Sequence, residues 1–123
     1  MVGYVCIGAS DFEKSVAWYE ALLGPIGAKR LMEFEGFVLI GRSMDTASVA
    51  VVRPFDGKPQ SAGNGMMVAL QLETKEDVDG IYERALASGG SDEGPPGNRG
   101  DIFYAGYFRD IDGNKLNAFC GVS

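Results

Sequence analysis

The segment 4–23, YVCIGASDFEKSVAWYEALL, is repeated in outline by the segment 67–86, MVALQLETKEDVDGIYERAL, 63 residues further along the chain. In each copy a short apolar run precedes a periodic apolar pattern, which predicts a strand followed by an amphipathic helix. Coincidence explains one or two identities at this spacing but not a set in one register, so the sequence predicts an internal repeat. The identical pairs are Val5/Val68, Glu13/Glu76, Tyr19/Tyr82, Glu20/Glu83, Leu23/Leu86 and Gly27/Gly90.

Both predicted helices carry start and stop signals. Ser10 and Asp11 provide an N-cap for the first, and Gly24–Pro25 ends it. Thr74 caps the second, which runs to about Ser88 before two glycines. Each helix therefore has defined ends that agree with the repeat.

Strand patterns follow each helix. After the first helix, the segments 29–35 and 37–41 flank Gly36 as a hairpin, and 46–54 forms a further strand. After the second helix, the segment 92–100, DEGPPGNRG, is rich in Gly and Pro and predicts a loop, either a lid over a cleft or an ordinary connector. Two last strands, 102–110 and 115–122, are joined around Asp112-Gly113-Asn114.

The fold class that follows is α+β, with two βαβββ modules in tandem. We expect a single domain over residues 1–123, with module one at 1–54, a linker at 55–65 and module two at 66–123. A chain of 123 residues fits one domain of ordinary size.

Composition excludes several classes of function. The net charge of −6 and the lack of a cationic run argue against nucleic acid and against anionic membranes. No apolar stretch is long enough to span a bilayer, and the N-terminus lacks a secretion signal. We expect a cytoplasmic protein in which Cys6 and Cys120 are reduced and buried.

The chain contains no histidine, which excludes a Ser-His-Asp triad, a Cys-His pair and every zinc site that needs an imidazole. Cys6 as a nucleophile would need a Lys or Arg to lower its pKa.

Three strings resemble the vicinal oxygen chelate superfamily, which contains glyoxalase I, bleomycin resistance proteins and extradiol dioxygenases. They are SDFEKSVAWYEALLGPIGAKRL at 10–31, NGMMVAL at 64–70 and YFRDIDGNKLNAF at 107–119. The resemblance implies curled mixed sheets that enclose a cleft. It also implies metal ligands at three places, and here Tyr4 and Met67 stand where histidines are expected, and Asn117 where Glu is expected.

A phenol, a thioether and a neutral amide are poor ligands for zinc, nickel or iron, so we expect no metal and no other cofactor. An all-oxygen site using Glu33, Glu35 or Asp101 remains an alternative. The string Asp110-x-Asp112-Gly113-Asn114 resembles a calcium loop, but Lys115 stands where an EF-hand needs Gly, which favours a hairpin.

Strand alternation predicts which side chains line the implied cleft. Tyr4 and Cys6 share one face of the first strand, and Val5, Ile7 and Ala9 share the other, against the helix. Arg53 and Arg109 lie at strand ends, where they either clamp an anion or stay solvated; of Tyr104 and Tyr107, alternation alone does not say which faces the cleft. The predicted ligand-binding set is Tyr4, Cys6, Met67, Gln71, Tyr107, Asn117 and Phe119.

These residues suggest a metal-independent binder of a small hydrophobic or aromatic molecule. The resemblance to the family also leads us to expect a homodimer. The alternative is an enzyme, a glyoxalase-type lyase or a dioxygenase with an atypical metal site. A third hypothesis is a structural or regulatory protein with a filled cleft. No catalytic residue is identified by the sequence.

Overall fold

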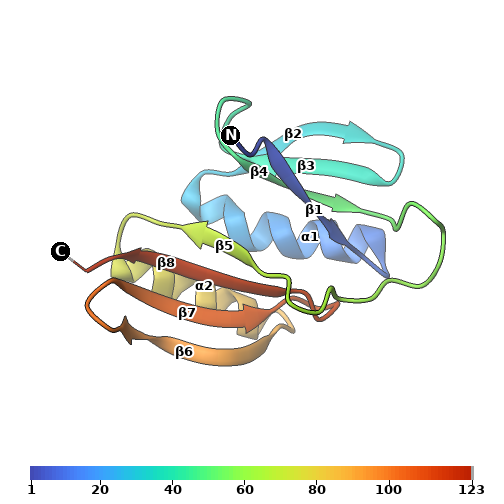
Figure 1. The fold of residues 1–123 in the computed structure, drawn as a ribbon. Coiled ribbons are helices and arrows are strands. Elements are labelled where there is room, and N and C mark those ends of the chain that lie inside the picture. Colours follow the sequence, from blue (N-terminus) through green and yellow to red (C-terminus); the bar gives the residue numbers. More distant parts are fainter. Residues whose placement is uncertain (123) are drawn as a thin grey trace. The chain divides into compact units, whose positions relative to one another are not determined.

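The computed structural model describes residues 1–122, which divide into two compact units, Met1–Ala62 and a second unit from Gly63 onward. Each unit has the order strand, helix, three strands, so the prediction of two βαβββ modules is confirmed. Figure 1 shows the first unit in blue to green and the second in yellow to red. Neither helix is long and apolar enough to cross a membrane.

The first unit is a four-stranded mixed sheet with one helix. In space the strands run β1-β4-β3-β2, with β1 parallel to β4 and the remaining neighbours antiparallel. The elements are β1 (Tyr4–Gly8), α1 (Phe12–Leu23), a 3-10 turn (Gly24–Ile26), β2 (Lys29–Phe34), β3 (Phe37–Gly41) and β4 (Ser48–Val52).

The second unit repeats this plan. Its strands run β5-β8-β7-β6, and β5 is parallel to β8. The elements are β5 (Val68–Gln71), α2 (Lys75–Ala87), β6 (Ser91–Arg99), β7 (Phe103–Arg109) and β8 (Lys115–Gly121). The helices α1 and α2 begin 63 residues apart, as the repeat predicts.

Local chemistry explains where the helices start. Asp11 caps α1 by accepting from the backbone N–H of Lys14 at 3.2 Å, and Thr74 caps α2 by accepting from that of Asp77 at 3.0 Å. Each helix then buries one apolar stripe in its own unit, including Tyr19 in α1 and Ile81 in α2.

The predicted loop at 92–100 is wrong, because residues 91–99 form strand β6. This strand lies at the edge of its sheet, where a missing N–H is tolerated. Pro95 and Pro96 fall within a register shift between Gly94 and Gly97, so neither has to donate to the ladder. With a paired strand there, the lid hypothesis is dropped.

The last hairpin confirms the turn prediction and not a calcium loop. The buried Asp110 carboxylate accepts from the backbone N–H groups of Asp112 and Asn114 at 2.8 and 2.9 Å, and from the Asn114 side-chain amide at 2.9 Å. Gly113 adopts a φ of +87°, which a glycine takes without strain. The Asp110 side chain therefore acts inside the turn between β7 and β8.

Candidate functional site

Each sheet has one face toward its own helix and one face away from it, which we call the open face. In the first unit Val38 of β3 and Val16 of α1 line the same hollow, so Val38 lies on the helix face. Val51 and Ile7 are paired in register with Val38 across the sheet and lie on that face too. Their neighbours Leu39, Ala50 and Cys6 therefore belong to the open face. Tyr4 shares this face by alternation, as predicted.

Aromatic side chains meet on the open face of the first unit. The Tyr4 and Phe37 rings pack edge to face with centroids 5.8 Å apart, and Phe34 lies at the same distance from Phe37. Tyr4 is 52% exposed and Cys6 is exposed, so the expectation that both cysteines are buried is wrong for Cys6. Alternation already placed Cys6 on this face; Cys120 is buried as expected, and both thiols are free.

The open face of the second unit holds four of the predicted residues. Tyr104 donates its hydroxyl to Asp79 of α2 at 2.6 Å, which fixes Tyr104 on the helix face and Tyr107 on the open face. Tyr107 pairs in register with Asn117, and Gln71 pairs with Phe119. Met67 precedes β5 and is 42% exposed.

Asn117 is the most unusual of these side chains. It is only 3% exposed, yet its Oδ1 atom accepts no hydrogen bond from any residue that the structure describes. A buried carbonyl oxygen without a donor costs about 1–3 kcal/mol, so its persistence calls for an explanation. Its register neighbours on this face are Tyr107 and Ala69.

Two cationic side chains lie near the ring of Tyr107. The Arg99 guanidinium lies 5.3 Å and the Lys115 ammonium 5.7 Å from the centroid of its ring. Arg109, at the end of β7, pairs with Glu93 at 2.7 Å and donates to the Gly113 carbonyl at 2.7 Å. Neither an anion clamp nor full solvation describes Arg109, because it ties the strand end to its turn.

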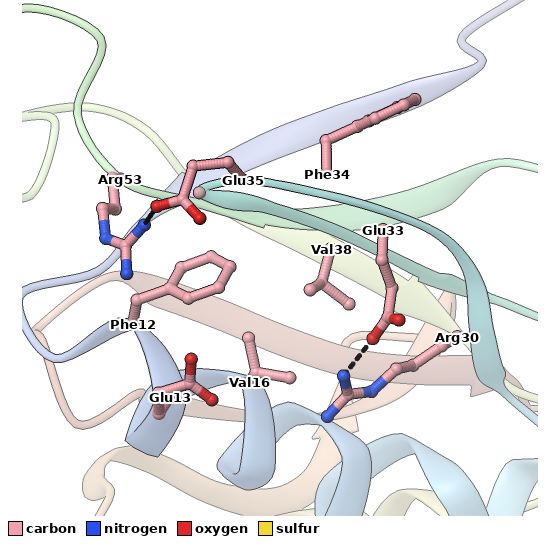
Figure 2. Close-up of a pocket in the computed structure, with 10 residues that line it drawn as sticks. Phe12, Glu13, Val16, Arg30, Glu33, Phe34, Glu35, Val38 and Arg53 are labelled. Carbon is pink, nitrogen blue, oxygen red and sulfur yellow. Dashed lines mark hydrogen bonds and ion pairs between the residues drawn. The ribbon is translucent and has the colours of Figure 1, made fainter.

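The first unit contains a hollow of about 390 Å³ that the sequence did not suggest (Figure 2). Its centre is apolar, with Phe12 and Val16 from α1 and Val38 from β3. Arg53 pairs with Glu35 and lies over the Phe12 ring at 4.7 Å. No residue of the predicted ligand-binding set lines the hollow, because it opens on the helix face. Glu33 and Glu35, considered above for an all-oxygen metal site, and Arg53, considered as an anion clamp, do line it. No local motif could have revealed a space formed between separate elements.

A second set of ion pairs, centred on Arg30, lies at the other side of the hollow. Arg30 donates to both carboxylate oxygens of Glu20 at 2.7 and 2.8 Å and also pairs with Glu33. These contacts raise the pKa of Arg30 and lower the pKa of Glu20. Both arginines of the hollow therefore already have carboxylate partners.

The residues present do not fit a transition metal of the implied kind. The three expected ligand places hold the phenol of Tyr4, the thioether of Met67 and the amide of Asn117, and the chain has no imidazole. Glu33 and Glu35, which the all-oxygen alternative invoked, are engaged by arginines. Within residues 1–122 no group of three or more metal-binding side chains comes together.

Comparison with known proteins agrees with this architecture. A glyoxalase/bleomycin resistance protein from Albidiferax ferrireducens T118 is 31% identical, with a TM-score of 0.89 over 98% of both chains. A lactoylglutathione lyase from Agrobacterium tumefaciens, at 19% identity and a TM-score of 0.69 over 98% of this chain and 93% of its own, shares the fold. A search of curated proteins found no match. Residues 2–118 match the model of the Glyoxalase/Bleomycin resistance protein/Dioxygenase superfamily, and the chain belongs to this superfamily.

Proposed function

We propose that the chain binds a small molecule with an aromatic or apolar body on the open face of the second unit, without a metal. The observation that carries this proposal is the buried Oδ1 of Asn117, which has no donor among residues 1–122. A ligand N–H or O–H would satisfy it.

The neighbouring side chains suit such a ligand. Tyr107 is half-buried beside Asn117, and Phe119 packs against Phe103 with centroids 5.6 Å apart. A few polar groups among aromatic surfaces are typical of small-molecule sites. That Tyr4, Cys6 and Met67 line one cleft with this face stays a prediction.

The probe for this proposal is 4-hydroxybenzamide, which is neutral, aromatic and carries a phenolic donor. We expect it to shift the backbone amide NMR signals of Tyr107, Asn117 and Phe119, and to do so equally in excess EDTA. Asn117→Leu keeps the side-chain size and removes the acceptor, so binding should weaken about tenfold, as for one lost hydrogen bond. Loss of binding in EDTA, or unchanged affinity in Asn117→Leu, contradicts the proposal.

Stability distinguishes a lost ligand contact from a damaged fold. Because Asn117→Leu removes a buried carbonyl oxygen that has no donor among residues 1–122, we expect the free energy of unfolding in urea to rise by about 1 kcal/mol. Asn98→Leu, at an exposed position of β6, is the matched control and should change neither the ligand affinity nor the free energy of unfolding.

We also propose that the chain forms a homodimer, and native mass spectrometry of the metal-free protein will test this.

A further inference from the structure

Arg99, the last residue of the Gly- and Pro-rich strand β6, has its guanidinium fixed by carbonyl groups of the same strand. Arg99 folds back along its own strand and donates from Nη1 to the Gly97 carbonyl and from Nη2 to the Pro95 carbonyl, both at 2.9 Å. These two bonds fix the plane of the guanidinium while leaving other N–H groups free to donate.

The two glycines of this strand make room for that conformation. A Cβ atom at Gly97 would lie 3.2 Å from Arg99 Nη1, and one at Gly94 would lie 3.4 Å from Nη2. Gly94 also has a φ of +155°. The segment that composition predicted as a loop thus holds one guanidinium against the ring of Tyr107.

Among residues 1–122, the two cations beside the Tyr107 ring have no carboxylate partner. Arg99 and Lys115 are half-buried, and the salt bridges of residues 1–122 pair neither of them with a carboxylate. By contrast, Arg30, Arg53 and Arg109 each have a Glu partner. Arg99 and Lys115 repel each other across the Tyr107 ring, and an anion bound between them would offset that repulsion.

We infer that the ligand of the second unit is an aromatic acid, whose carboxylate or phosphate is bound by Arg99 and Lys115 beside Tyr107. Asn117 follows Lys115 by two residues on the same strand and the same face, so its Oδ1 accepts a hydrogen bond from a donor elsewhere on that ligand. This inference rests on the proposed function and adds the acid group to it.

The test compares 4-hydroxybenzoate with the neutral 4-hydroxybenzamide, using NMR titration of the full chain. We expect the acid to bind at least tenfold more tightly at low salt, with a preference that falls as salt increases. Arg99→Gln and Lys115→Gln should each remove most of this preference, because the acid loses much more affinity than the amide when a cation is removed. Lys58→Gln, in an exposed loop of the first unit, is the control and should change neither affinity.

The two proposals fail in different ways. Equal affinity for acid and amide, or a preference that survives both substitutions, overturns the inference and leaves the proposed function standing. Absence of binding by both compounds overturns the proposed function itself. Because Arg99 also supports strand carbonyls, its variant is accompanied by a urea unfolding curve, and Lys115→Gln tests the same charge without that role. Titration with phenyl phosphate shows whether carboxylate or phosphate is preferred.

Discussion

At the scale of single residues, the two tyrosines of β7 have different contacts because they lie on opposite faces of the sheet. Tyr104 and Tyr107 are three residues apart on β7 and face opposite sides. Tyr104 binds Asp79 of α2, and Tyr107 carries two cations near its ring. Tyr104 is therefore bonded within the fold, and Tyr107 lies on the open face, where we propose that the ligand binds.

The contact between Tyr104 and Asp79 gives a prediction for pH. The hydrogen bond to the Asp79 carboxylate, followed by burial, raises the pKa of Tyr104 from 10.0 to about 12. The folded state then keeps a proton that the unfolded chain loses near pH 10, so this contribution to stability is complete below pH 10 and is lost as pH rises toward 12. Asp79→Asn should return the pKa toward 10.

The measurement is a pH titration of the Tyr104 ring carbon bonded to oxygen, followed by NMR and assigned with Tyr104→Phe. Ionisation of Tyr104 near pH 10 in the unmodified chain would refute the hydrogen bond as a cause. An unchanged pKa in Asp79→Asn would assign the shift to burial instead.

At the scale of elements, β6 shows that a strand can form from a composition that disfavours strands. Its position at the sheet edge and its register shift accommodate both prolines. The repeat contained a signal for it, because strand β2 at 29–34 corresponds to 92–97 at a spacing of 63 residues. Composition predicted a loop here, and the equivalent position of β2 in the first unit explains why a strand forms instead.

A substitution at Gly94 tests how much β6 depends on its glycines. Gly94→Ala places a methyl group at a φ of +155°, within 3.4 Å of Arg99 Nη2 and 3.5 Å of the Tyr107 ring. We expect the free energy of unfolding to fall by about 1 kcal/mol or more. Gly121→Ala, in the same sheet but with no neighbour within 4 Å of the added atom, should be close to neutral. Equal urea midpoints for both variants would show that the backbone at Gly94 imposes no requirement.

At the scale of the whole molecule, the repeat made the fold predictable and left the site only partly so. Caps such as Asp11 and Thr74 and turns such as Gly113 act over a few residues, so local sequence contains them. Alternation grouped Asn117 with Phe119 on one face of the last strand, but it left Tyr104 and Tyr107 undecided until the contact of Tyr104 with Asp79 of α2 showed which of them faces the helix. The missing donor at Asn117 and the hollow beside Phe12 depend on packing between distant segments, which no local pattern encodes.

The repeat also provides a matched comparison between the two units, because Leu23 and Leu86 occupy equivalent positions near the ends of α1 and α2. Leu23 is 4% exposed, whereas Leu86 is only partly buried. Leu23→Ala should lower the free energy of unfolding by about 3 kcal/mol, through lost burial and the cavity left behind. Leu86→Ala should cost about half as much, since the solvent already reaches part of its side chain.

The two variants share the same chemical change, helix type and repeat position, so burial is the variable that separates them. Urea unfolding followed by circular dichroism measures both in one format. Equal losses would mean that the two cores contribute alike in spite of their different burial. A larger loss of free energy of unfolding in Leu86→Ala than in Leu23→Ala would contradict the prediction. It would mean that the core of the second unit, to which we assign the ligand, contributes more to stability than the burial of Leu86 indicates.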